Sequence, residues 1–106
     1  MWKPGTAVTL TGTNVKQALT TTVGLVKAIR FMQHWGNANR LYLGDATLDP
    51  AASPAVGIIV WLPAPAAGLI SYAEQYETES PNGINANQLY VAGNVGEIVL
   101  WSYLEQ

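Results

Sequence analysis

Apolar residues along this chain alternate with polar ones over short segments, and glycine, proline and asparagine separate these segments. Alternation with a period of two residues is typical of a β-strand that buries one face. No stretch repeats its apolar residues with the clean spacing of an amphipathic helix. We therefore expect about eight short strands, at residues 7–11, 15–22, 25–34, 40–44, 57–62, 69–72, 89–92 and 98–104.

Residues that favour turns fill the intervals between these strands. We predict a turn at 35–39, a loop at 45–54, a stiff proline-containing connector at 63–68, a polar segment at 74–87 with a turn at 80–83, and a hairpin turn at 93–96. This spacing predicts the all-β class, as a small antiparallel β-sandwich or barrel, with a jelly-roll-like arrangement as one form of it. The competing interpretation places a helix at 15–22 or at 69–79.

Two of the predicted strands, 25–34 and 98–104, are apolar on both faces. In the second of them Ile98, Leu100 and Leu104 share one face with Ser102, while Val99, Trp101 and Tyr103 share the other. An antiparallel strand in a free monomer usually keeps one polar face in water. Such a strand is therefore a central strand with both faces covered, contains a bulge, or contacts another subunit.

Aromatic side chains carry much of the binding energy of protein interfaces, and this chain has four tryptophans. We take as candidate interface residues those that are aromatic or share a strand face with aromatic residues: Trp2, Trp61, Val99, Trp101 and Tyr103.

A chain of 106 residues has the length of one domain with its own core. We assign residues 1–12 to an N-terminal arm and first strand, and residues 13–106 to a single β-sandwich domain. Trp2 and Lys3 precede the flexible Pro4-Gly5 pair, so the arm either clips onto a neighbour or frays. No apolar run has the length of a signal peptide or membrane helix, so we expect no membrane partner.

Charged residues make up only 11% of the chain, against about 25% in ordinary soluble domains. The hydrophobic content of 49% argues against disorder, and a net charge of -2 with scattered basic residues argues against nucleic-acid binding. The absence of cysteine excludes disulfides and cysteine-based zinc sites. The low charge indicates that part of the surface is covered in the working state.

No residue set points to catalysis, and we expect no enzyme, no cofactor and no metal. His34 is the sole histidine, and no serine lies in a nucleophile motif. Asp45 and Asp49 bracket the predicted loop but lack the third carboxylate of a calcium site. The acidic residues Glu74, Glu77 and Glu79 are expected on a solvated loop or against a basic neighbour.

The order of these segments resembles a family of small virion proteins of tailed bacteriophages. Its elements are a V-K-x-[VI]-x-[VIF] strand at 26–31, an asparagine-rich turn, a [VL]-Y-[VL]-G-D strand at 41–45, a proline- and glycine-containing stretch, and [LI]-Y-[VL]-x-[GA]-x-x-G at 89–96. The resemblance covers residues 15–104. An apolar-x-Pro-Gly-Glu turn of the family is missing, which affects the alignment of residues 46–70.

The resemblance implies a non-enzymatic β-sandwich component of the virion. Within that class we expect a capsid decoration, or cement, protein that binds the major capsid protein or other virion proteins and forms homo-oligomers, with a trimer favoured. A tail, adaptor or fibre component is the alternative in the same class. A carbohydrate-binding module that uses exposed tryptophans as sugar platforms is the alternative from another class.

Overall fold

The computed structural model describes residues 1–34, 36–64 and 75–106, and for residues 75–81 it describes the backbone alone. The described strands are β1 (Trp2–Pro4), β2 (Val8–Thr9), β3 (Gln17–Ala18), β4 (Leu25–Gln33), β5 (Leu41–Asp49), β6 (Val56–Leu62), β7 (Gln75–Asn85), β8 (Tyr90–Ala92) and β9 (Ile98–Leu104). The short 3-10 helix η1 spans Ala86–Gln88. The prediction of an all-β protein is confirmed.

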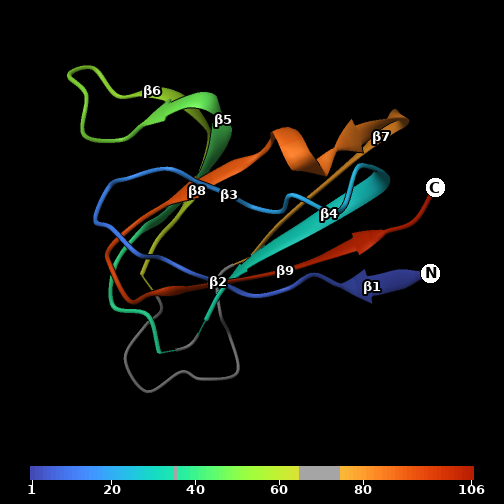
Figure 1. Ribbon diagram of the computed structural model, residues 1–106, viewed down its shortest axis with the longest axis horizontal. Coiled ribbons are helices and arrows are strands. Elements are labelled where there is room, and N and C mark those ends of the chain that lie inside the picture. Colours follow the sequence, from blue (N-terminus) through green and yellow to red (C-terminus); the bar gives the residue numbers. More distant parts are fainter. Residues whose placement is uncertain (35, 65–74) are drawn as a thin grey trace.

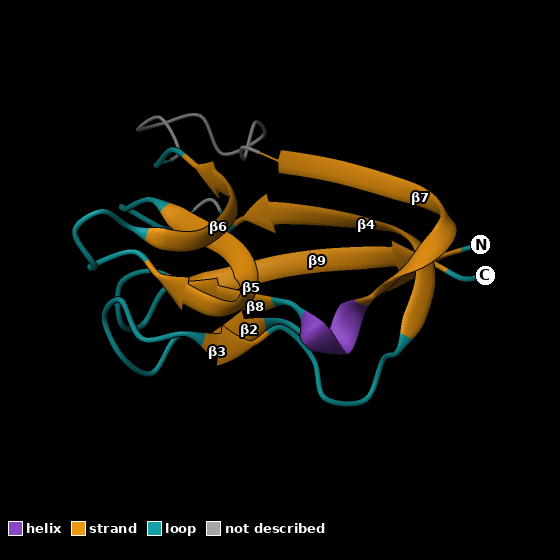
Figure 2. Ribbon diagram, turned by 90° about the horizontal axis from the view of Figure 1, so that it is seen from above, coloured by secondary structure: helices purple, strands orange, loops and turns teal. Residues whose placement is uncertain are grey.

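The strands form two antiparallel sheets that pack face to face (Figures 1 and 2). Sheet A has the order β1-β9-β4-β7, with β2 also paired with β9, and sheet B has the order β3-β8-β5-β6. Buried apolar side chains from both sheets fill the space between them, among them Ile29 and Phe31 from sheet A and Leu43 and Val91 from sheet B. The fold is therefore a β-sandwich with one core.

The pairing of strands is nested along the chain. β1 and β2 pair with the last strand β9, β3 pairs with β8, β4 with β7, and β5 with β6. With β1 and β2 counted as one interrupted strand, this is the connectivity of a jelly roll. It brings the two termini together at one end of the molecule (Figure 1), where Trp2 lies opposite Leu104.

The N-terminal arm pairs within its own sheet, so neither of the two expected states of this arm, frayed or clipped onto a neighbour, is seen. The register with β9 runs from Trp2 opposite Leu104 to Val8 opposite Val99, which leaves one extra residue in the N-terminal strand. The interruption lies at Gly5, whose N–H donates to the carbonyl of Trp101 at 2.8 Å. A Cβ on Gly5 would overlap the indole of Trp101, so this position requires glycine.

Strand β4 explains why segment 25–34 is apolar on both faces. It lies between β9 and β7, and its register with β7 shifts between Val26 and Ala28. Val26 pairs with Ile84 and Ala28 with Glu79, so residues 80–83 bulge from β7 opposite Lys27. Of the alternatives for segment 25–34, the central strand is confirmed, whereas the bulge lies in the neighbouring strand β7. The predicted turn at 80–83 is wrong because these residues form this bulge.

The polar segment 74–87 was expected as a loop, and this prediction is wrong for most of its length. Residues Gln75–Asn85 form β7, the edge strand that pairs with β4. Polar composition disfavours strands only weakly, and main-chain pairing with a neighbouring strand overrides it. Likewise, β5 continues to Asp49 through residues expected in the loop 45–54.

The turn at 93–96 does not close a hairpin, because β8 belongs to sheet B and β9 to sheet A. Val91 and Val99 on either side of it are buried in the shared core, so the chain crosses from one sheet to the other at this point. The helix considered at 15–22 is absent, and residues 75–79 of the other candidate form a strand. The remaining part of that candidate, and the whole strand predicted at 69–72, lie outside the described residues.

Candidate interaction surfaces

The five predicted interface residues divide between the core and the surface. Val99 and Trp101 expose 0% and 3% of their surface and belong to the core. Tyr103 is half-buried and packs against that core, with its ring 5.5 Å from the ring of Trp101. The prediction that Val99 and Trp101 contact a partner is therefore corrected, because this side of β9 faces sheet B.

The opposite side of β9 faces outward and carries the apolar residues Leu100 and Leu104. In the register of the sheet, Met32 on β4 lies opposite Leu100, and Trp2 on β1 lies opposite Leu104. All four are half-buried, and the Arg30 guanidinium lies 4.4 Å from the ring centre of Trp2. We call Trp2, Arg30, Met32, Leu100 and Leu104 the sheet A face.

Trp61 lies on the edge strand β6 of sheet B and exposes 45% of its surface. The Arg40 guanidinium lies 3.8 Å from its ring centre, so the cation covers one face of the indole. Ile59, two residues earlier, exposes 51%. Trp2 and Trp61 thus remain available for a partner, and Trp35, in the turn after β4, lies outside the described residues.

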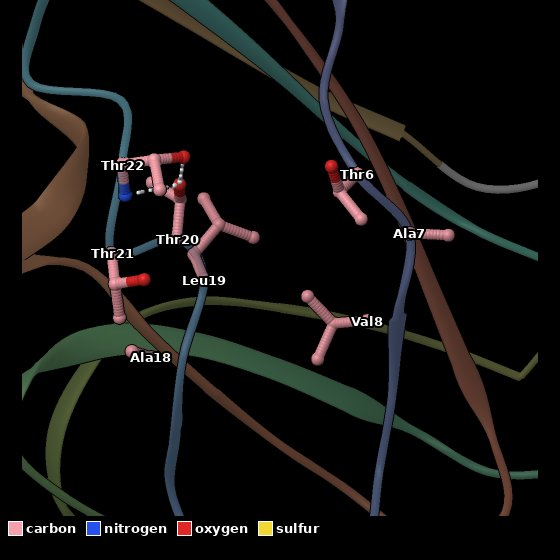
Figure 3. Close-up of a pocket in the computed structure, with 8 residues that line it drawn as sticks. All are labelled: Thr6, Ala7, Val8, Ala18, Leu19, Thr20, Thr21 and Thr22. Carbon is pink, nitrogen blue, oxygen red and sulfur yellow. Dashed lines mark hydrogen bonds between the residues drawn. The ribbon is translucent and has the colours of Figure 1, made fainter.

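A cavity of about 320 Å³ opens between β2 and β3, where the first strands of the two sheets diverge (Figure 3). Its lining consists of uncharged residues: Thr6, Ala7, Val8, Ala18, Leu19, Thr20, Thr21 and Thr22. The Thr20 hydroxyl accepts hydrogen bonds from the N–H groups of Thr22 and Val23, each at 3.2 Å. No side chain in this lining is an acid, a base or an activated nucleophile, so the cavity offers hydroxyl groups and methyl groups only.

A buried polar network joins the turn after β4 to the start of β9. Asn37 donates from Nδ2 to Gln33 Oε1 and to the Ile98 carbonyl, both at 2.7 Å, and its Oδ1 accepts from the Ile98 N–H at 2.9 Å. Glu97 exposes only 8% of its surface. Its Oε2 accepts from the backbone N–H groups of Ala38 at 2.5 Å and Asn39 at 3.1 Å, whereas Oε1 is buried without a hydrogen-bond partner.

No sequence motif marks this network. Its signals in the sequence are a glutamine at the end of an apolar strand and a glutamate directly after a turn glycine. Both residue types are common on surfaces, so only the fold reveals that they are buried together. The network holds two connections in place and involves no group positioned for proton transfer to a ligand.

The other candidate residues make local contacts. The N–H of Gly36 donates to His34 Nδ1 at 2.9 Å, and the N–H of Ala51 donates to Asp49 Oδ1 at 3.2 Å. Within the described residues, no three histidine, cysteine, aspartate or glutamate side chains cluster to hold a metal ion. Glu77 and Glu79 lie on strand β7 rather than on a loop, with Glu77 in register with Arg30, and Glu74 lies outside the described residues.

Asp45 and Thr47 both lie on β5, and the hydroxyl and backbone N–H of Thr47 donate to Asp45 Oδ1 at 2.5 and 2.8 Å. These two bonds, and to a smaller extent the charge of Lys16, lower the pKa of Asp45 below its ordinary value of 3.8. The stability that this adds is complete above pH 3.8 and is lost as the pH falls through the lower pKa of the folded state.

We expect Thr47→Val to weaken this pH dependence, because it removes the side-chain hydrogen bond and keeps the backbone one. The melting temperature of the variant should fall less steeply than that of the wild type below pH 3.8. Thr20→Val is the control, because the hydroxyl that it removes accepts from backbone N–H groups and bonds to no carboxylate of the described residues. It should leave the slope of melting temperature against pH unchanged. Parallel melting curves for wild type and Thr47→Val at every pH would contradict the prediction.

Comparisons with protein-family models, with curated proteins and with solved structures found no match. In the described part of the chain, no helix has the length and apolar character needed to cross a membrane. The function is therefore inferred from the surfaces of this chain described above.

Proposed function

We propose that this chain is a non-enzymatic structural protein of a tailed-bacteriophage particle, and within that class a capsid decoration protein. The observation that carries the proposal is the sheet A face, where four apolar side chains and Arg30 lie on the outside of a sheet. On this side the uncharged Ser102 lies between Leu100 and Leu104, and the backbone of Glu77 in β7 is in register with Arg30. Such a face is suited to an apolar partner surface of low charge. The jelly-roll fold adds an analogy, since viral capsid domains use it.

The mechanism is mass action. Each bound copy removes the sheet A face from water and contacts neighbouring copies of the major capsid protein. A ligand that binds only the assembled state stabilises that state by an amount that grows with its concentration.

Leu100→Lys is expected to weaken binding to the particle at least about tenfold, which corresponds to about 1.4 kcal/mol. The lysine places a charge in the middle of the sheet A face, next to Met32. The measurement is a titration of the purified chain onto particles that were assembled without it. Val15→Lys, on an exposed loop position, is the matched control and should bind like the wild type.

Unchanged binding of Leu100→Lys, with the variant still folded, would contradict the proposed surface. The position of the chain on the particle, seen by electron cryomicroscopy, separates decoration from a tail, adaptor or fibre role. Density on the tail would replace the decoration role by that alternative. A particle whose proteins do not include this chain would contradict the whole class.

A carbohydrate-binding role is the second candidate, and the exposed indole of Trp61 favours it. Tyr42 lies opposite Trp61 in the sheet, so two aromatic rings share that surface. Against this role, Arg40 already covers one face of the Trp61 ring. Titration with oligosaccharides, followed by tryptophan fluorescence in the wild type and in Trp61→Ala, distinguishes the two functions, because only sugar binding gives a signal that the variant loses.

A further inference from the structure

The described strands leave four sheet edges, formed by β1 with β2 and by β7 in sheet A, and by β3 and β6 in sheet B. An edge strand presents N–H and C=O groups that another strand can pair with. Natural proteins prevent this pairing with charged residues, prolines, bulges or very short edge strands. The four edges can therefore be compared by these features.

Three of the four edges carry a charged residue or a proline, or are very short. The edge of β1 contains Lys3 and Pro4 and is interrupted before β2. Strand β3 is two residues long. Strand β7 contains glutamates and a proline in its sequence, and residues 80–83 bulge from it.

Strand β6 differs from the other edges. It is seven residues long and contains no charged residue and no proline. It has a bulge at Ile59, but the side chain at this bulge is apolar and exposed. In a protected edge strand, such a position commonly carries a charged residue. Ile59 and Trp61 are exposed on either side of Val60, which packs against the core. Nothing in the sequence of β6 opposes pairing with another strand.

We propose that β6 pairs antiparallel with β6 of a second copy of this chain, around a two-fold axis at Val60. In this register, Trp61 of each copy lies opposite Ile59 of the partner subunit, an aromatic and β-branched pair that favours strand association. Because β6 is uncharged, self-pairing places no like charges opposite each other. The contact joins two sheets B into one continuous sheet.

A second copy fits this edge better than a strand of another protein. The matching strand must itself be apolar, uncharged and open along one edge, and β6 has these three properties. Arg40 stays stacked on Trp61 of its own chain and does not lie in the paired strand. The inference does not rest on the proposed role in the particle, because it concerns two copies of the purified chain alone.

Sedimentation equilibrium of the purified chain over a range of concentrations tests the pairing. We expect the wild type to approach twice the monomer mass of 11.4 kDa as the concentration rises. Ile59→Lys should raise the dissociation constant of the dimer at least tenfold, which corresponds to about 1.4 kcal/mol. At protein concentrations too low for the wild type to dimerise, the melting temperature of this variant should match that of the wild type. Val95 is an exposed β-branched residue outside β6, so Val95→Lys is the matched control and should dimerise like the wild type.

Cross-linking gives a second measurement, because the chain contains no cysteine of its own. Ile59→Cys and Trp61→Cys chains, mixed and oxidised, should form a mixed disulfide more readily than either chain alone. Directly opposed Cα atoms of antiparallel strands are about 4.5–5.5 Å apart, which is within the range of a disulfide. A wild-type chain that stays monomeric at all concentrations would overturn the proposal. It would be overturned even if β6 of that chain paired with a strand of another protein. A dimer that Leu100→Lys disrupts and Ile59→Lys does not would also overturn it.

Discussion

Replacing Trp101 with alanine is expected to lower the free energy of unfolding by about 3–5 kcal/mol. The indole is 3% exposed and packs among the buried residues of both sheets. Its Nε1–H also donates to the Thr6 carbonyl at 2.9 Å, so the substitution removes a hydrogen bond as well as apolar contacts. Urea denaturation followed by circular dichroism measures the effect without relying on tryptophan fluorescence.

Trp61→Ala is the matched control, because this tryptophan lies at the surface. Its loss is expected to change the free energy of unfolding by less than about 1 kcal/mol. If Trp101→Ala instead kept its stability and lost only binding to a partner, the assignment of this residue to the core would be wrong.

Gly5→Ala provides a further check on the same contact, since its added methyl would collide with the Trp101 indole. The variant should be destabilised in the wild-type background and much less so in the Trp101→Ala background, where the ring is absent. Equal destabilisation in both backgrounds would show that the two residues do not interact.

The second large effect is expected for Glu97→Ala, with a loss of about 2–4 kcal/mol in the free energy of unfolding. The substitution leaves the backbone N–H groups of Ala38 and Asn39 without their acceptor. Both hydrogen bonds are partly buried, and a donor shielded from water that loses its partner costs more than the net value of the hydrogen bond itself. Thermal or urea unfolding measures the loss.

Glu97→Gln is the matched control, because its amide oxygen can still accept from both N–H groups. We expect it to retain most of the stability of the wild type. A loss in Glu97→Gln as large as that in Glu97→Ala would indicate that the negative charge, rather than the acceptor geometry, stabilises the turn at 36–39.

Alternation along the chain was sufficient to predict the β class and several strands. The predicted strand at 25–34 matches β4 to within one residue, and the one at 98–104 matches β9. These strands are long and rich in β-branched and aromatic residues, so local pattern and tertiary environment agree. The edge strand β7 escaped prediction because its polar sequence forms a strand only through its pairing with β4.

The candidate interface residues Val99 and Trp101 of β9 turned out to be core residues for a related reason. Both sides of that strand are apolar, so the alternation of residues along it does not indicate which side faces the second sheet. The answer depends on the turn at 93–96, which carries the chain from sheet B to sheet A. Local sequence indicates a turn there but does not specify whether the following strand pairs with the preceding one or with β1 and β4.

The central position of β9 in sheet A has a consequence for synthesis of the protein. Its neighbours β1, β2 and β4 precede it, yet they have no direct contact as paired strands until Ile98–Leu104 is inserted between them. A nascent chain that has reached residue 97 therefore holds the strands of sheet A without the one that joins β1 and β2 to β4, and one edge of β4 is unpaired. Folding of this sheet must wait until the ribosome has released β9, and products that stop earlier should be substrates for chaperones and proteases.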